Sequence, residues 1–173
     1  GIGSVAKIAD MELSDWRWIL GVNLWGVIHG VKAFLPRLLA NPAGGHIVNT
    51  ASMSGLATLP TLGGYGVTKY GVMALSEALA QELQTDGAKV GVTVLCPGPV
   101  RSNIKASSRN RPAGLAAGGL TDTDLEKNPI AAEMRWLEPD EVGEIVVRAV
   151  RRGDFYALTH PEMGDRVQER FQG

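Results

Sequence analysis

The feature that most constrains the fold is a set of three short, nearly all-apolar segments separated by helical patterns. The segments are Ile47–Ala51, Val90–Cys96 and Phe155–Thr159. Short β-branched segments without polar alternation are typical of strands that are covered on both faces. Such strands alternating with helices predict parallel β-α-β units, in an open α/β sheet with helices on both faces. Three strands make only part of such a sheet.

Helical periodicity appears in three stretches of the chain. From Ser14 to Leu39 apolar residues recur at helical spacing with glycines between them, which predicts one short helix and one long one. Tyr65–Leu83 contains few helix breakers and is rich in strong helix formers. A third helix is predicted from Pro139 to a stop at Gly153, with acidic residues in its first turn and arginines in its last.

Residues 103–136 are rich in Gly, Ala, Ser and Arg and show only short helical patterns. This composition predicts a long mobile loop or lid. Lys105, Arg109 and Arg111 cluster there, and they could attract an acidic substrate or a cofactor phosphate, or simply be solvated. Residues 1–173 are expected to form a single, partial domain.

Composition excludes several classes of function. The net charge is −1 and the isoelectric point about 6.3, so neither nucleic acid nor a membrane surface is an expected partner. The only cysteine, Cys96, cannot form an internal disulfide and suits a reducing cytoplasm. No uninterrupted apolar run is long enough for a membrane span. His29, His46 and His160 lack ligand-like spacing, so no metal site is expected.

Tyr65 and Lys69 are four residues apart in a predicted helix, which places them on one face. A tyrosine of ordinary pKa is a poor base at neutral pH, and a neighbouring cation lowers the pKa of its phenol. The pair is therefore a candidate for proton transfer. Taken alone, Tyr65 could equally be a surface phenol and Lys69 a solvated charge.

Ser52 follows the first predicted strand, on the side of an open α/β sheet where ligands bind. A hydroxyl there could stabilise a developing alkoxide, although a turn serine is the simpler interpretation. Ser54, two residues further on, is a rival serine.

Four separated motifs together resemble the short-chain dehydrogenase/reductase family. They are Asn23-Leu24-Trp25-Gly26, Gly45-His46-Ile47-Val48-Asn49-Thr50-Ala51-Ser52, Tyr65-Gly66-Val67-Thr68-Lys69 and Pro97-Gly98-Pro99-Val100-Arg101-Ser102. The resemblance covers nearly the whole chain. It implies that the sheet is the C-terminal part of a Rossmann-type, doubly wound parallel sheet with helices on both faces.

The resemblance also implies roles for individual residues. Tyr65 would be the catalytic acid/base, Lys69 would lower the pKa of Tyr65 and bind the nicotinamide ribose, and Ser52 would orient the substrate oxygen. Asn23 would anchor a water-linked proton relay, and Asn49 would help to fix the active-site backbone. The residues expected to bind the cofactor, NAD or NADP, are Gly1, Asn23, Tyr65, Lys69, Pro97, Gly98, Val100 and Ser102. Ser102 stands where the family more often has threonine.

The first residues, Gly1-Ile2-Gly3-Ser4-Val5-Ala6, satisfy the dinucleotide pattern G-x-G-x-x-A, but no strand precedes them. They look instead like the end of the family's Asn-Asn-Ala-Gly motif, with Gly1 as its last glycine. This implies that the phosphate-binding turn and the residue that reads the adenosine ribose lie upstream, so the choice between NAD and NADP stays open. The isolated chain is expected to bind dinucleotide poorly and to expose an unpaired strand edge.

The expected function is an NAD(P)-dependent oxidoreductase that interconverts a secondary alcohol and a carbonyl, with a small-molecule substrate. One alternative is a truncated, non-catalytic remnant with an interaction or structural role. Another is epimerase or dehydratase chemistry with the same Tyr65 and Lys69. Apolar residues on more than one face of the helices around Asn23 and Tyr65 predict association, and the resemblance implies a homodimer or homotetramer.

Overall fold

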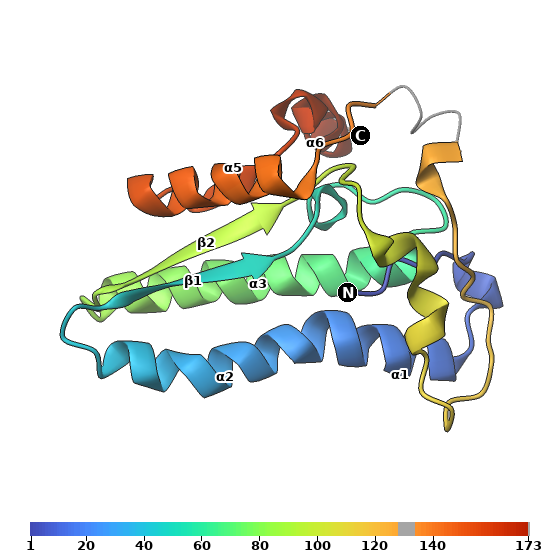
Figure 1. Cartoon of the computed structure of the whole chain (residues 1–173), viewed down its shortest axis with the longest axis horizontal. Helices are drawn as coiled ribbons and strands as arrows, with labels where there is room; N and C mark the ends of the chain where they lie inside the picture. The colour runs from blue at the N-terminus through green and yellow to red at the C-terminus, as the bar shows by residue number, and fades with distance from the viewer. Residues whose placement is uncertain (128–133, 173) are drawn as a thin grey trace.

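The computed structural model describes residues 1–127 and 134–172, and it shows a parallel sheet flanked by helices (Figure 1). The strands are β1 (Gly45–Thr50), β2 (Val90–Cys96) and β3 (Tyr156–Leu158), in the order β1-β2-β3. Ile47 pairs with Val92 and Leu95 with Ala157, both in parallel register. The predicted parallel α/β sheet is confirmed. β3 is one residue shorter at each end than predicted.

The helical elements lie before, between and after the strands. They are η1 (Ile8–Asp10), α1 (Leu13–Leu20), η2 (Gly21–Trp25), α2 (Gly26–Leu39), η3 (Met53–Gly55), α3 (Gly63–Thr85), η4 (Asn103–Asn110), η5 (Leu125–Lys127), α5 (Pro139–Arg152), η6 (Pro161–Met163) and α6 (Gly164–Gln172). The helix predicted from Pro139 matches α5, which ends at a left-handed Gly153. The α6 helix has no counterpart in the sequence predictions.

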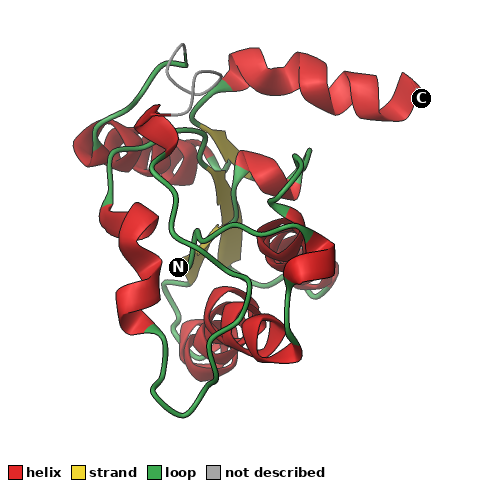
Figure 2. Cartoon of the chain, turned by 90° about the vertical axis from the view of Figure 1, so that its right-hand side faces the viewer, coloured by secondary structure: helices red, strands yellow, loops and turns green. Residues whose placement is uncertain are grey.

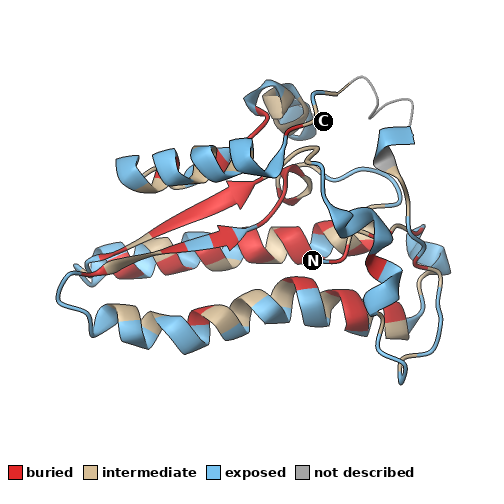
Figure 3. Cartoon of the chain, viewed as in Figure 1, coloured by how far each residue is buried: buried red, intermediate tan, exposed pale blue. Residues whose placement is uncertain are grey.

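Helices cover both faces of the sheet (Figure 2). The alternation of side chains along β2 decides what each face contacts. Val92 and Val94 face α3, where they join two buried apolar clusters. Leu95 faces the other way and packs with Ala149 of α5 and Ala157 of β3. Buried residues therefore concentrate on the strands and on the inner side of α3 (Figure 3).

The predicted short and long helices between residues 14 and 39 are joined without a break. Between α1 and α2 lies η2, a π-helical turn that keeps the whole stretch helical from Leu13 to Leu39. By length and composition alone this stretch could cross a membrane. In this fold it packs along α3 and β1. The apolar residues on these helices that predict association are only partly exposed. Trp25 and Phe34 are exposed, whereas Val72 of α3 is fully buried.

The outer edge of β1 is open among the described residues, because β1 pairs only with β2 there. An open groove of about 500 Å³ runs beside this edge, between β1 and α2. Its lining includes Val31, Phe34 and Leu38 from the helix and Val48 from the strand. The groove lies apart from Tyr65 and Ser52, which do not line it.

The predicted lid, residues 103–136, is only partly covered by the structure, since residues 128–133 lie outside the described residues. Over 103–127 the chain contains η4 and η5, and an isolated antiparallel bridge joins Thr121 to Val5. Asp122 accepts hydrogen bonds from Ser4 and Ser108. This segment is therefore attached to the first residues of the chain.

Candidate active site

Tyr65, Lys69 and Ser52 meet at the carboxyl end of β1. Ser52 begins η3 just after the strand, and the other two residues lie one turn apart near the start of α3. The Lys69 ammonium lies 5.5 Å from the centroid of the Tyr65 ring. Lys69 Nζ also donates a hydrogen bond to the carbonyl oxygen of Thr50, at 3.0 Å. The structure therefore brings together three of the predicted site residues.

Burial controls the protonation of this pair. Lys69 is only 6% exposed, and desolvation lowers the pKa of its ammonium to about 8. Burial raises the pKa of the Tyr65 phenol, and a hydrogen bond with Ser52 acts in the opposite direction. The net direction for Tyr65 is opposite to the one predicted from a neighbouring cation, because burial disfavours the charged phenolate more than the Ser52 hydrogen bond favours it.

Ser52 is fixed by its own backbone surroundings. Its hydroxyl donates to the carbonyl oxygen of Pro97 at 3.3 Å and accepts from the Ser54 amide at 3.1 Å. The Met53 amide donates to the same Pro97 oxygen at 2.9 Å. These bonds tie Ser52 to the Pro97-Gly98 turn, so the rival Ser54 supports Ser52 through its backbone.

Asn23 lies in the π-helical turn and is buried, with 3% of its surface exposed. Its side chain accepts from the Ile2 amide at 2.7 Å and donates to the Ile2 carbonyl at 2.9 Å. Gly1 is adjacent, since a Cβ on Gly1 would lie 3.3 Å from Asn23 Oδ1. The Asn23 side chain therefore holds the first residues of the chain by bonding both the amide and the carbonyl of Ile2, as the backbone of a neighbouring strand would. Its role in a proton relay stays a prediction.

The predicted cofactor turn, Pro97 to Ser102, is braced on several sides. The Gly98 amide donates to Thr159 Oγ1 at 3.0 Å. Val100 forms an isolated parallel bridge with Leu137. The Leu137 amide donates to the Pro99 carbonyl oxygen, and the Leu137 carbonyl oxygen accepts from the Arg101 amide. The exposed Ser102 caps η4 by accepting from the Ile104 amide at 3.4 Å.

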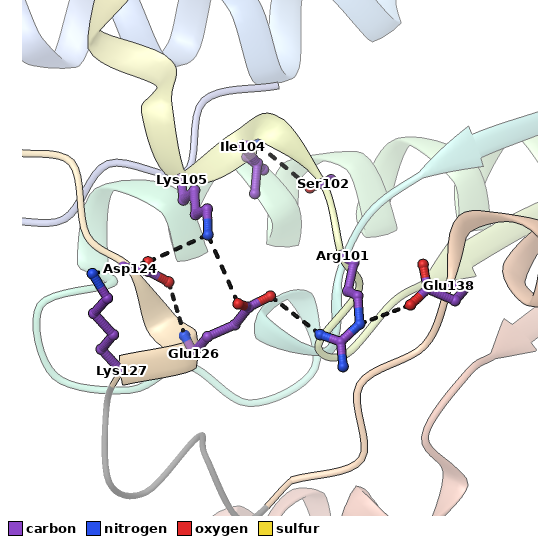
Figure 4. Close-up of polar contacts among 8 residues, drawn as sticks. All are labelled: Arg101, Ser102, Ile104, Lys105, Asp124, Glu126, Lys127 and Glu138. Atoms are coloured by element: carbon purple, nitrogen blue, oxygen red, sulfur yellow. Dashed lines mark hydrogen bonds and ion pairs between the residues drawn. The ribbon is translucent and has the colours of Figure 1, made fainter.

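A network of surface ion pairs begins at Arg101, next to this turn (Figure 4). Arg101 bonds Glu138 at 2.7 Å and Glu126 at 3.4 Å. Lys105 bonds Asp124 at 3.3 Å and lies 3.8 Å from Glu126. The network connects the segment after β2 with the residues around η5 and with the start of α5. Its side chains are partly exposed, so each pair contributes little stability by itself.

The three basic residues predicted to cluster do not act together. Lys105 pairs with Asp124 and Glu126, Arg109 bonds the backbone carbonyls of Asn103 and Ala106, and Arg111 forms an ion pair with buried Asp15. Each cation has a partner within the chain. The sequence could not show this, because the Asp15 partner lies 96 residues away from Arg111.

Sequence reasoning also missed Thr159 and His160, which are almost completely buried beneath the Pro97-Gly98 turn. Their position at the end of an apolar strand was the one available signal. Among residues 1–127 and 134–172, no group of three or more His, Cys, Asp or Glu side chains could hold a metal ion.

Known proteins of one family match this chain along nearly its whole length. The family model for short chain dehydrogenases matches residues 1–113. The C alpha-dehydrogenase of Sphingobium sp. strain SYK-6 is 32% identical over 173 residues, which are 99% of this chain and 56% of that protein. The putative oxidoreductase SadH of Mycobacterium tuberculosis is 36% identical over 153 residues, 88% of this chain and 52% of that protein. The chain belongs to the short-chain dehydrogenase family.

Solved structures place the whole chain in the same fold. A short-chain dehydrogenase/reductase from Burkholderia phymatum in complex with NAD is 34% identical, with a TM-score of 0.85 over 99% of this chain and 63% of that one. A short-chain dehydrogenase from Sphingobium yanoikuyae in complex with NADPH has a TM-score of 0.73 and shares the fold at 21% identity, over 100% of this chain and 60% of that one. The chain spans between about half and two thirds of the length of these relatives. The predicted Rossmann-type fold is confirmed.

Proposed function

We propose that this chain carries the catalytic residues of a nicotinamide-dependent oxidoreductase that interconverts a secondary alcohol and a carbonyl. The observation that carries the proposal is the meeting of Tyr65, Lys69 and Ser52 at the carboxyl end of β1. This is the edge at which open α/β sheets bind ligands. A relative that holds NAD and a fold neighbour that holds NADPH support the cofactor class and leave both dinucleotides open.

The residues present fit a nicotinamide nucleotide. Among the described residues, the Lys69 ammonium has one hydrogen-bond acceptor, the Thr50 carbonyl oxygen. An ammonium carries three donors, so two are left for acceptors such as the hydroxyl groups of a ribose. The backbone from Pro97 to Val100, with Gly1, Asn23 and Ser102 around it, would hold the nicotinamide end. When bound, the nicotinamide accepts or gives up the hydride.

Proton movement would then fall to Tyr65. In alcohol oxidation its phenolate takes the hydroxyl proton as the carbinol carbon gives up hydride, and in carbonyl reduction its phenol returns that proton. The Ser52 hydroxyl would donate to the substrate oxygen, which stabilises the negative charge that develops there. Lys69 supplies positive charge at 5.5 Å from the Tyr65 ring, and this charge favours the phenolate.

The test compares Tyr65→Phe with Tyr156→Phe in the protein that contains this chain. Tyr156 is a matched control because it is 44% exposed and bonds to the surface residue Glu77. We expect Tyr65→Phe to abolish turnover of secondary alcohols while dinucleotide binding, followed by nicotinamide fluorescence, stays nearly unchanged. Tyr156→Phe should leave both intact. Turnover of Tyr65→Phe within about tenfold of the parent would refute the proposal.

A further inference from the structure

A chain of buried hydrogen bonds runs beneath the Pro97-Gly98 turn. The Gly98 amide lies 3.0 Å from Thr159 Oγ1, Thr159 Oγ1 lies 2.7 Å from His160 Nδ1, and His160 Nε2 lies 2.8 Å from the carbonyl oxygen of Arg135. Thr159 is 2% exposed and His160 1%. Polar side chains buried this deeply are costly unless their hydrogen bonds are made.

The donors and acceptors fix the direction of this chain. A backbone amide only donates, so Thr159 Oγ1 accepts from Gly98. A carbonyl oxygen only accepts, so His160 Nε2 carries a proton and donates it to Arg135. In a neutral imidazole Nδ1 is then an acceptor, and the Thr159 hydroxyl donates to it. One tautomer of His160 therefore satisfies every bond.

The imidazole also limits the turn sterically. A Cβ on Gly98 would lie 2.5 Å from His160 Nδ1 and 2.7 Å from its Cγ, so the ring packs directly against the glycine backbone. On the other side of the turn, Leu137 bonds to Pro99 and Arg101. His160 bonds to Arg135, two residues before Leu137. Gly98 is thus held by its amide and its Cα, and both contacts lead through His160 to the carbonyl oxygen of Arg135.

We propose that Thr159 and His160 are positioning residues that hold the Pro97-Gly98 turn in the conformation that receives a nicotinamide. The inference rests on the proposed function. Neither side chain reaches the reacting atoms. They act by fixing the backbone from Gly98 to Val100 before the cofactor arrives, so that less conformational freedom is lost on binding.

The first test needs no substitution. Hydrogen exchange and NMR on the protein that contains this chain should show a protected Gly98 amide and a His160 imidazole that carries a proton on Nε2. An amide of Gly98 that exchanges as fast as a solvent-exposed glycine, or a His160 proton on Nδ1 alone, would overturn the proposal.

The second test compares Thr159→Val with Thr159→Ser, because valine has the shape of threonine without its hydroxyl and serine keeps it. The probe is reduced nicotinamide mononucleotide, which lacks the adenosine half of the cofactor, and binding is followed through the Val100 amide signal. We expect Thr159→Val to weaken binding by about 5- to 20-fold, and Thr159→Ser to bind within about threefold of the parent. Thr85→Val, at an exposed helix end, is the control and should bind like the parent.

The outcomes separate the inference from the proposed function. Equal affinity of a folded Thr159→Val and the parent would overturn the positioning role and leave the oxidoreductase proposal untouched. In the protein that contains this chain, a protected Gly98 amide without binding of either the mononucleotide or NADH would count against the proposed function, and with it against a cofactor role for Thr159 and His160. If Thr159→Val does not fold, the exchange rate of the Gly98 amide in the parent still decides.

Discussion

Asp15 and Arg111 form a buried ion pair, with Asp15 Oδ1 and Arg111 Nη1 2.5 Å apart and the Asp15 side chain fully buried. Asp15 also accepts from the amides of Glu12 and Gly119. The Arg111 guanidinium lies 5.0 Å from the Trp18 ring. One carboxylate therefore joins the start of α1 to the segment that follows η4.

Asp15→Ala should lower the free energy of unfolding by about 3 to 5 kcal/mol, because it leaves the Arg111 charge without its partner. Urea unfolding measures this loss. Asp154→Ala is the control, since its pair with Arg152 is exposed, and it should cost less than about 1 kcal/mol. Similar costs for the two variants would show that the Asp15 pair has no special importance.

The same carboxylate predicts that the free energy of unfolding falls at acid pH. Burial tends to raise the pKa of Asp15, but hydrogen bonds from Arg111, Glu12 and Gly119 outweigh it, and the net direction is downward. Because the pKa of Asp15 is lower in the folded chain, the ionised carboxylate stabilises the fold at any pH above the pKa of an unfolded aspartate. This stabilisation is lost as the pH falls through the lowered pKa of the folded chain. Asp15→Asn should therefore flatten the pH dependence of unfolding below pH 4 or so. An unchanged slope would contradict the assignment.

Lys69 predicts a second pH dependence of the same sign, at alkaline pH. Its pKa is about 8 in the folded chain, against about 10.4 for an unfolded lysine. Above pH 8 the unfolded chain keeps a proton that the folded chain has released, so Lys69 contributes a rise in the free energy of unfolding. Above pH 9 Cys96 opposes it, because burial raises the pKa of that thiol to about 12. Denaturant titrations should thus show a free energy of unfolding that rises between pH 8 and 9. Lys69→Met should remove this rise, and Lys89→Met, at an exposed lysine, should keep it. Parallel curves for the parent and Lys69→Met would refute it.

Asn23→Leu should destabilise the chain by about 2 to 4 kcal/mol, because the amide and carbonyl of Ile2 lose buried partners. Thermal or urea unfolding gives the magnitude, and hydrogen exchange of the Ile2 amide gives the location. Asn110→Leu changes an exposed asparagine and serves as the control. If Ile2 exchanges no faster in Asn23→Leu, the side chain does not hold the first residues of the chain.

Cys96 should resist alkylation in the folded chain. Its thiol is completely buried beside Met73 Sδ, 3.6 Å away, and burial raises its pKa to about 12. The thiolate fraction near pH 8 is then about a thousandfold below that of an ordinary thiol. Mass spectrometry after iodoacetamide treatment should find modification only when denaturant is present. Rapid labelling of the native chain would contradict this burial.

Local patterns were sufficient for the sheet and for the central pair of the site. Val90–Cys96 is apolar except for Thr93, and both faces of β2 are covered by helices. Tyr65 and Lys69 are neighbours because both lie on one helix, where a separation of four residues fixes their contact. Such features depend on short stretches of sequence, so the sequence alone predicted them.

Features that depend on contacts between distant segments were not predictable. Gly98 and Thr159 are 61 residues apart and meet only because β3 pairs with β2 in one register. The α6 helix has a polar sequence with few apolar residues, and it is attached through Arg170, which bonds Tyr70 and Leu56. Helix propensity gave no reason to expect it. Its contacts are with residues about 100 positions earlier in the sequence, which only the folded chain brings near it.

The π-helical turn from Gly21 to Trp25 has a consequence for how the chain tolerates insertions and deletions. Such a turn accommodates one more residue than an α-helical turn, and each residue of an α-helix rotates the chain by about 100°. Deletion of one residue within this turn would therefore restore a regular helix and leave Trp18 and Asp15 facing close to their present direction. Deletion of one residue between Trp18 and Gly21 would instead swing the start of α1 by about 100°, and Asp15 would face away from Arg111. The amino-terminal side of the site therefore tolerates the loss of a residue at this turn better than in the regular part of α1.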